Sequence, residues 1–175
     1  MTLRDDIAAA RLPPSAQRVF SFRSEGARGD MLYAFKPGYK EFKDRQRKRT
    51  KPKSIRFVGI ADIGDFYPRI YTHRLKAALE AATQNSHKDT IRVLEKLLTQ
   101  FSGGTSYGIP VGPPASRPLA EAVLIDVDSA LKARGVDFVR FVDDYVIFGI
   151  DRGISSFFRG DVVFESWSNT SNRKD

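Results

Sequence analysis

The stretch that decides the fold runs from Val139 to Phe148 and reads Val-Arg-Phe-Val-Asp-Asp-Tyr-Val-Ile-Phe. Residues that favour β-strands flank an acidic pair on both sides, and neither flank contains a helix-forming run. The pattern predicts a strand, a tight turn and a second strand, with Asp143 and Asp144 at the turn. Taken alone, two acidic residues at a hairpin tip are most often just a solvated turn.

A second apolar strand upstream also ends in an acidic residue. Residues 57–61 read Phe-Val-Gly-Ile-Ala and are followed by Asp62. This strand and the hairpin with Asp143 and Asp144 can form one anionic site between them. Mg²⁺ is usually held by few protein carboxylates together with substrate phosphates. The grouping therefore suggests phosphoryl transfer assisted by two metal ions.

Three segments together resemble the palm motifs of reverse transcriptases. Residues 62–67, Asp-Ile-Gly-Asp-Phe-Tyr, look like the first motif, and residues 141–144, Phe-Val-Asp-Asp, resemble the Tyr/Phe-x-Asp-Asp box. Between them, residues 108–112, Gly-Ile-Pro-Val-Gly, with Ser116 downstream, look like the middle motif. An Asp-Asp pair alone would carry no information, but three segments in the family's order, spanning residues 57 to 149, are a specific signal.

The resemblance implies an α+β fold, the right-hand palm of a polymerase. We expect an antiparallel sheet formed by the 57–62 strand and the 138–148 hairpin, backed by two or three helices. The expected organisation is a partial fingers region with a basic segment in residues 1–56, a palm core in 57–150 and a short tail in 151–175. The family continues beyond this point into a primer grip and a helical thumb. We therefore expect a C-terminally truncated chain in which the thumb is absent, or one that a partner chain completes.

Local patterns predict the remaining elements. Apolar periodicity predicts helices from Thr72 as N-cap, from about Lys88, and over 116–133. A short helix is expected before Pro13, and strands are expected over 19–23 and 31–35. The apolar face expected to lie in the core of the second helix comprises Ile91, Leu94, Leu97, Leu98 and Phe101.

The resemblance also implies roles for individual residues. Asp62, Asp143 and Asp144 would be catalytic and would hold two Mg²⁺ ions, which Mn²⁺ can replace, with the backbone carbonyl of Ile63 as a further ligand. One ion would activate a primer 3′ hydroxyl, and the other would neutralise the triphosphate. The residues implied to bind the nucleotide are Asp65, Phe66, Tyr67, Val111, Gly112 and Ser116.

Several of these nucleotide-binding assignments have plain structural alternatives. Asp65 either lies beside the triphosphate or is a surface turn acid. Gly112 and Ser116 are either a turn glycine and a helix cap, or they cradle the nascent base pair. Tyr67 stands where reverse transcriptases place an aromatic steric gate against the ribose 2′ hydroxyl, which implies a DNA product; it also argues against an RNA polymerase.

Residues 36–56 form the strongest run of positive charge in a chain of formal net charge +8 and pI near 9.8. Such a balance favours a polyanionic partner. The run is either a solvated, partly disordered linker or a fingers-side surface on RNA template, DNA primer or triphosphate, with Tyr39 and Phe42 interleaved for packing or stacking. The residues we expect to contact nucleic acid are Arg45, Arg47, Lys48, Arg49, Lys51 and Lys53.

Two positions narrow the resemblance. Common template-copying enzymes carry Gln and Pro where this chain has Val111 and Arg117. Together with residues 65–75, this is similar to abortive-infection and other antiphage-defence reverse transcriptases of bacteria, some of which are implied to extend DNA without a conventional template. The expected function is an RNA-directed DNA polymerase that extends a DNA 3′ hydroxyl with dNTPs. The alternative is a catalytically inactive, nucleic-acid-binding fragment of such an enzyme.

Composition excludes other classes of site. The chain has no cysteine and only two histidines, which rules out disulfides and makes a zinc site improbable. No apolar run approaches the roughly 18 residues that a membrane span needs. We expect a cytoplasmic protein without a membrane partner.

Overall fold

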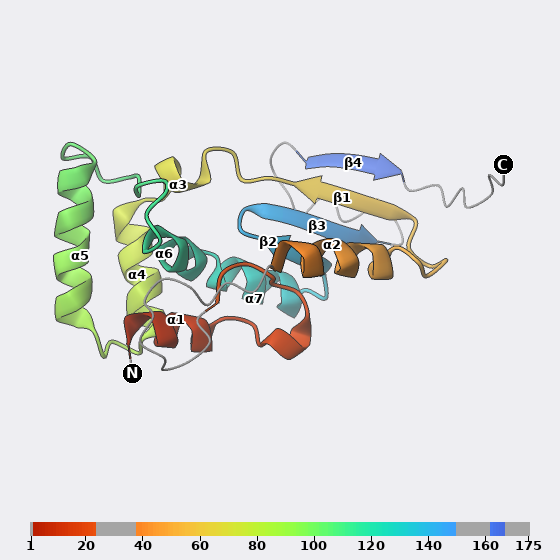
Figure 1. Ribbon diagram of the computed structural model, residues 1–175, viewed down its shortest axis with the longest axis horizontal. Helices are drawn as coiled ribbons and strands as arrows, with labels where there is room; N and C mark the ends of the chain where they lie inside the picture. The colour runs from red at the N-terminus through yellow and green to blue at the C-terminus, as the bar shows by residue number, and fades with distance from the viewer. Residues whose placement is uncertain (1, 24–37, 150–161, 167–175) are drawn as a thin grey trace.

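The computed structural model describes residues 2–23, 38–149 and 162–166, the last segment by its backbone alone. Figure 1 shows most helices gathered at one end and the sheet at the other. The elements in chain order are α1 Leu3–Ala10, the 3₁₀ helix η1 Pro14–Ala16, α2 Gly38–Arg49, β1 Phe57–Ala61, α3 Phe66–Arg69, α4 Thr72–Ala82, α5 Lys88–Phe101, α6 Ser116–Val123, α7 Ile125–Ala133, β2 Asp137–Phe141, β3 Asp144–Gly149 and β4 Val162–Ser166.

The strands form one antiparallel sheet in the order β2-β3-β1-β4. The hairpin β2–β3 and its antiparallel pairing with β1 confirm the predicted α+β class and the predicted sheet. The segment after η1 forms backbone hydrogen bonds with the outer edge of β2. The amide of Phe20 donates to the Arg140 carbonyl at 2.9 Å, and the amide of Arg140 donates to the Arg18 carbonyl at 2.7 Å.

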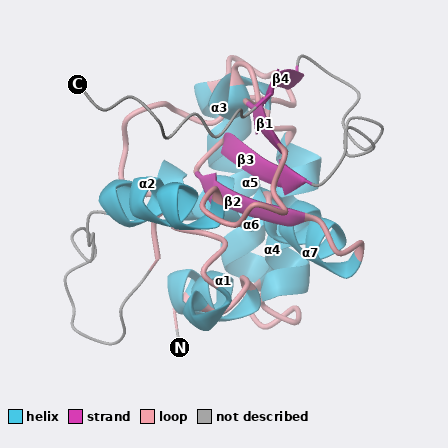
Figure 2. Ribbon diagram, turned by 90° about the vertical axis from the view of Figure 1, so that its right-hand side faces the viewer, coloured by secondary structure: helices cyan, strands magenta, loops and turns pink. Residues whose placement is uncertain are grey.

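Side chains on both faces of the hairpin are buried. Side chains alternate along a strand, so Tyr145 and Ile147 of β3 pack with Leu131 of α7 on one face. Val146 and Phe148 point the other way and pack with Phe42 of α2. Figure 2 shows the sheet between α2 and α7. The basic run at residues 38–49 is therefore an ordered helix anchored by a phenylalanine that is 2% exposed, not a disordered linker.

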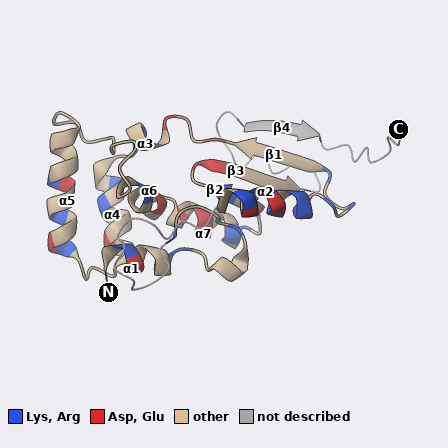
Figure 3. Ribbon diagram, viewed as in Figure 1, with Lys and Arg blue, Asp and Glu red and all other residues tan. Residues whose placement is uncertain are grey.

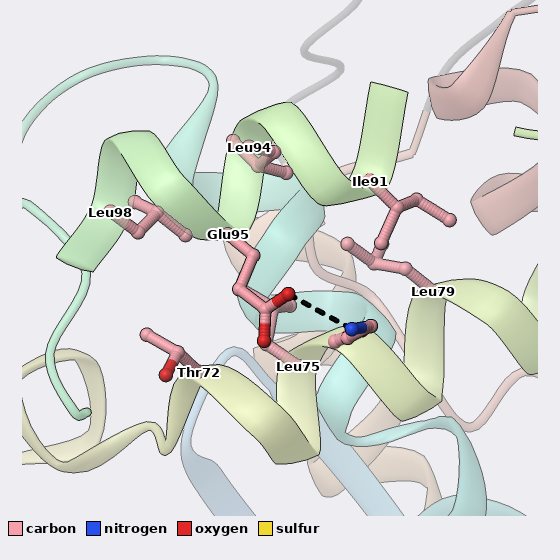
Figure 4. A pocket seen from close by; sticks show the side chains of 8 residues that line it. Thr72, Leu75, Leu79, Ile91, Leu94, Glu95 and Leu98 are labelled. Carbon is pink, nitrogen blue, oxygen red and sulfur yellow. Dashed lines mark hydrogen bonds and ion pairs between the residues drawn. The ribbon is translucent and has the colours of Figure 1, made fainter. Parts of the chain in front are cut away.

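A separate core joins the helices. Ile7 of α1 lies in this core with residues of α4, α5 and α6. Figure 4 shows how Leu75 and Leu79 of α4 face Leu94 and Leu98 of α5, with the Lys76–Glu95 ion pair at 3.0 Å marked by the dashed line. Residues from the first expected region, 1–56, thus share cores with residues of the second, since Ile7 lies in the helical core and Phe42 packs on the sheet.

The expected apolar face of α5 is partly wrong. Ile91 and Leu98 are buried, but Leu97 is 47% exposed and Phe101 is 78% exposed. Consecutive helical residues lie about 100° apart, so α4 covers the side with Leu98 and leaves Leu97 uncovered. Apolar content alone did not show how wide a face α4 would cover.

Three other local predictions need correction. The helix expected over 116–133 is two helices, because the amide of Leu124 bonds to the Glu121 carbonyl in a tighter turn. The strand expected over 19–23 is a single bridge between Val19 and Arg140. Thr72 is the first residue of α4 rather than its N-cap, and its hydroxyl donates to the Ser106 carbonyl at 3.0 Å. The strand expected over 31–35 lies outside the described residues.

Candidate functional site

The sheet brings the two acidic strand ends together. β1 and β3 pair antiparallel, and the last pair is Ala61 with Tyr145. One step further along the same register, Asp62 stands opposite Asp144. Residues directly opposite in an antiparallel pair have their Cβ atoms about 4.5–5.5 Å apart and share a face. Since Tyr145 faces α7, Asp144 lies toward the α2 face of the sheet.

Asp143 sits in the tight turn itself. β2 ends at Phe141 and β3 begins at Asp144, so Val142 and Asp143 alone form the connection. Val142 has φ +57, a left-handed conformation that a β-branched residue rarely adopts. The turn leaves Asp143 half-buried and Asp144 exposed at the mouth of the site.

The electrostatics of the site are those of uncompensated acids. Burial, together with the charges of Asp62 and Asp144, raises the pKa of Asp143, although a hydrogen bond from its own backbone N–H acts in the opposite direction. Burial and Asp62 likewise raise the pKa of Asp144, which Lys43 of α2 partly offsets. The charge of Asp62 therefore acts on the pKa values of both residues, in agreement with the strand register.

An open pocket of about 320 Å³ lies against this acidic turn. It unites members of all three sequence segments: Tyr67 from the first, Val111 and Gly112 from the second, Asp143 and Asp144 from the third. The complete lining is Phe22, Tyr67, Val111, Gly112, Pro113, Arg117, Phe141, Val142, Asp143 and Asp144.

Backbone hydrogen bonds explain why the middle segment lies next to the first. The amide of Ile109 donates to the Tyr67 carbonyl at 3.0 Å, and the amide of Gly108 donates to the Ile70 carbonyl at 2.8 Å. Gly108 has φ +96, and a Cβ there would lie 3.3 Å from the Pro68 carbonyl oxygen. Only glycine fits this close approach without strain.

Some residues assigned to nucleotide binding do not line the pocket. Phe66 is 6% exposed in the helical core, and Ser116 is 4% exposed at the start of α6. The carboxylate of Asp65 pairs with Arg69 at 3.1 Å on the surface. Ile63, whose carbonyl was the expected further ligand, packs its side chain against both the helical core and the α7 face of the sheet.

Other residues near the site were not among those expected there. Phe22 and Phe141 supply aromatic walls to the pocket, and the Arg117 guanidinium lies over the Phe22 ring at 4.7 Å. Lys43 holds its ammonium 5.4 Å from the centre of the Tyr39 ring, which in turn contacts Phe141 edge-on at 5.2 Å. Phe141 pairs with Asp144 in the hairpin, so α2 places Lys43 close to the acidic turn.

The basic helix divides into two sides. Arg49 turns inward and pairs with Asp137 at 3.2 Å, and Arg45 is half-buried beside it. Arg47 and Lys48 face outward, and the Arg47 side chain is 79% exposed. Figure 3 shows α2 alongside the acidic ends of β1 and β3. Lys51 and Lys53, in the loop after α2, are also exposed.

The carboxylates fit a magnesium ion only in part. Within residues 2–23 and 38–149, no three His, Cys, Asp or Glu side chains are grouped closely enough to hold a metal ion by themselves. Mg²⁺ does not require such a cage, because it is usually bound through one or two carboxylates, waters and substrate phosphates. Asp143 and Asp144 supply carboxylates of that kind in a pocket with room for a phosphate-bearing ligand. Asp62 does not line this pocket, but its charge acts on both residues.

Comparison with models of known protein families gives no match, and a search of curated proteins finds no relative. Across the part of the chain that the structure describes, no helix has the length and apolarity to cross a membrane.

Proposed function

We propose that this chain is a nucleotidyltransferase module that extends a DNA 3′ hydroxyl with dNTPs in the manner of a reverse transcriptase. The observation that carries the proposal is the single pocket lined by Tyr67, Val111, Gly112, Asp143 and Asp144. These residues come from three separated segments. From the resemblance, Tyr67, Val111 and Gly112 were expected to bind the nucleotide, and Asp143 and Asp144 were expected to bind the metal ions.

The chain's residues divide the work of such a reaction. Asp62, Asp143 and Asp144 would hold Mg²⁺, which when bound neutralises phosphate charge and activates the attacking hydroxyl. Burial and, after it, the charge of Asp62 raise the pKa values of Asp143 and Asp144, and a bound divalent ion would offset the repulsion among these carboxylates. Arg117, which lines the pocket, and Lys43, whose charge lowers the pKa of Asp144, would contact substrate phosphates.

Tyr67 sets the sugar preference in this proposal. Its ring is half-buried, lines the pocket and packs edge-on against Phe66 at 5.5 Å, which fixes its orientation. A rigid ring excludes a 2′ hydroxyl by steric overlap. The product is therefore DNA.

The choice between templated and untemplated synthesis centres on Val111. This side chain is 71% exposed at the pocket and cannot form hydrogen bonds. A role in bacterial antiphage defence, with RNA template or DNA primer as partner, follows from the resemblance of residues 65–75 and 108–117.

A second candidate function is nucleic-acid binding without catalysis. The exposed positive charges of α2 and the following loop, Arg47, Lys48, Lys51 and Lys53, favour it. Such a surface binds phosphates whether or not the carboxylates hold a metal.

One experiment separates the two candidates. Binding of a fluorescent dNTP and of an NTP is measured with Mn²⁺, with Mg²⁺ and without metal, followed by an extension assay with a primed template. We expect metal-dependent dNTP binding that Asp143→Asn abolishes, and a gain of NTP binding in Tyr67→Val. Nucleic-acid binding with no metal-dependent dNTP binding would refute the polymerase proposal and favour the binding fragment.

A further inference from the structure

Four charged side chains lie fully buried behind the acidic turn. We call Arg11, Glu121, Asp128 and Arg140 the buried charge cluster; their side chains in its ion pairs are 0–1% exposed. Two cations and two anions balance, as burial away from water demands. They come from the end of α1, from α6, from α7 and from β2, so the cluster joins the helical core to the hairpin.

Arg140 is the centre of the cluster. Its Nε and Nη2 atoms donate to Asp128 at 2.9 and 2.6 Å, and its Nη1 and Nη2 atoms donate to Glu121 at 3.1 and 2.9 Å. These two anions hold the guanidinium in one orientation, because a planar fork with fixed donors cannot turn without losing bonds on both sides. Arg11 adds a further contact to Glu121 at 2.7 Å.

Arg140 makes two hydrogen bonds outside the cluster, and the longer one goes to the Ser21 hydroxyl at 3.3 Å. In the shorter one, the Nη1 atom donates to the carbonyl oxygen of Val142 at 2.7 Å. The carbonyl of Val142 and the N–H of Asp143 belong to one planar peptide group. Fixing that oxygen therefore fixes the direction of the Asp143 N–H, and with it the start of the Asp143 side chain.

The held peptide is also a strained one. Val142 at φ +57 adopts a conformation that costs an L-residue roughly 1–2 kcal/mol. Such residues persist only where surrounding contacts determine them. A charge-assisted hydrogen bond is of the size needed to offset this cost. Arg140 is thus placed to keep the turn in a shape that its own sequence disfavours.

The cluster reaches the pocket at a second point. Nη1 of Arg11 donates to the carbonyl of Phe22, and Nη2 donates to the carbonyl of Ser21 at 3.2 Å. Phe22 lines the same pocket as Asp143. The two arginines therefore hold backbone on both sides of the pocket, and Glu121 holds both arginines.

We propose that Arg140 is a positioning residue: anchored by Glu121 and Asp128, it clamps the Val142–Asp143 peptide and so sets the direction of the Asp143 carboxylate toward its metal ion. The clamp itself stands on the contacts above, while its purpose rests on the proposed function. Buried ion clusters can often be replaced by apolar side chains without loss of stability, so stability alone gives little reason for this one. The bond from Arg140 to the Val142 carbonyl instead links the cluster to the turn that carries Asp143.

The test compares Arg140→Lys with Tyr145→Phe. Lysine keeps the buried positive charge but lacks the fork that reaches Asp128, Glu121 and the Val142 carbonyl together. Tyr145→Phe is the matched control, because it removes a hydroxyl that donates to Asp128 at 3.2 Å and leaves the turn untouched. Two quantities are measured: metal-free hydrogen exchange of the amides of residues 142–144, and the Kd for Mn²⁺ by electron paramagnetic resonance.

In Arg140→Lys we expect the hydrogen-exchange rates at residues 142–144 to rise about tenfold, because one charge-assisted hydrogen bond is lost. The exchange rates of α4 and α5 should not change. Mn²⁺ binding should weaken by about tenfold or more, the usual effect of losing a group that orients a metal ligand. Tyr145→Phe should leave both values as in the parent chain. Equal hydrogen-exchange rates at residues 142–144 in Arg140→Lys and Tyr145→Phe would refute the proposal that Arg140 holds the turn.

Two further outcomes are decisive. A parent chain that binds no Mn²⁺ refutes the proposed function, while the metal-free exchange rates still judge the clamp by themselves. If Arg140→Lys does not fold, Glu121→Gln takes its place, since it keeps the volume and removes one of the two anchoring charges. It should then raise exchange at residues 142–144 more than Tyr145→Phe does, and equal values would overturn the proposal.

Discussion

The hairpin β2–β3 carries two groups of charges that differ in almost every respect. Behind it, Arg140 and its partners are dry, paired and balanced. At its tip, Asp143 is half-buried and Asp144 is exposed. Arg140 lowers the pKa of Asp143 and Lys43 lowers that of Asp144, but both pKa values stay raised. Arg140 and Asp144 are four residues apart, yet Arg140 is paired with two buried carboxylates and the pKa of Asp144 stays raised.

The contrast separates what stabilises the molecule from what is free to act. The buried carboxylate Glu121 would have its pKa raised by burial, but Arg140 and Arg11 hold it below its usual value. At the turn nothing reverses the upward shift of the Asp143 pKa. The charge of Glu121 therefore stabilises the folded state, although burial raises the pKa of its neighbour Asp128, and the charge of Asp143 destabilises it. Carboxylates with raised pKa values beside a pocket are typical of a functional site.

The largest expected effect is on the buried side. Glu121→Ala should leave two arginines without their shared anion and reduce the free energy of unfolding by about 3–5 kcal/mol. Urea denaturation measures it. Glu95→Ala is the control, because the Glu95–Lys76 pair is 29–37% exposed and should be worth at most about 1 kcal/mol. Equal losses in the two variants would contradict a special role for the cluster.

Divalent cations should act on the turn alone. Mn²⁺ at one hundred times its Kd should stabilise the parent chain by about 2.7 kcal/mol, as for any ligand of the folded state. Asp143→Asn should abolish this gain, since a neutral amide is a poorer ligand for a hard cation. Thermal melts with and without Mn²⁺ measure it, and Asp126→Asn, an exposed acid on α7, should retain the full gain.

Glu121 and Asp143 should contribute to stability with opposite pH dependences. Because the pKa of Glu121 is lowered on folding, its contribution is complete above the ordinary Glu value of about 4.3 and is lost as pH falls through the folded value. Because the pKa of Asp143 is raised, its cost is absent at low pH and sets in as pH rises from about 3.9 through the folded value.

Denaturation of metal-free protein at two pH values tests this. Asp143→Asn should stabilise the chain at pH 7 by up to about 1 kcal/mol, the scale of partly exposed charges, and should have no stabilising effect near pH 3. Glu121→Gln should destabilise at pH 7, and the difference should shrink in acid. A stabilisation by Asp143→Asn that is independent of pH would show that the charge is not its cause.

The smallest expected effect belongs to the outer side of α2. Replacing Arg47 and Lys48 by Gln should leave stability unchanged and reduce the salt dependence of nucleic-acid affinity by up to about one unit per lost phosphate contact. Fluorescence anisotropy across a salt series measures the slope. Arg92 and Lys96 of α5 provide a control pair of exposed cations far along the chain, and an unchanged slope in the α2 variant would remove this helix from the binding surface.

The sequence predicted the β-strands of the sheet core better than it predicted the surroundings of the site. Alternating apolar residues and the acidic strand ends were local signals, and Ala61 pairs with Tyr145 as the predicted sheet requires. The break at Leu124 was missed because apolar periodicity runs through it. The contribution of Phe22 to the pocket depends on contacts over more than a hundred residues, which no local pattern carries.

The buried charge cluster was the largest omission. The sequence pattern places Arg140 in a strand and gives no signal for Arg11 or Glu121, because an arginine or glutamate in a helical pattern is usually solvated. Only the meeting of α1, α6, α7 and β2 shows that their charges neutralise one another. Phe66 and Ser116 illustrate the reverse error, since they were assigned to nucleotide binding from their place in or beside a motif but lie buried.

The pairing of β1 with β3 restricts how this chain can change its length. Asp62 and Asp144 are brought together purely by counting from Ala61 and Tyr145, and a strand turns successive side chains to opposite faces. Point substitutions within β1 leave that count intact, whereas one residue inserted or deleted between Phe57 and Ala61 turns Asp62 to the α7 face and separates it from Asp144. Insertions and deletions should therefore be tolerated in the loop after α2 and not in this strand, and a library of single-residue insertions would map the boundary.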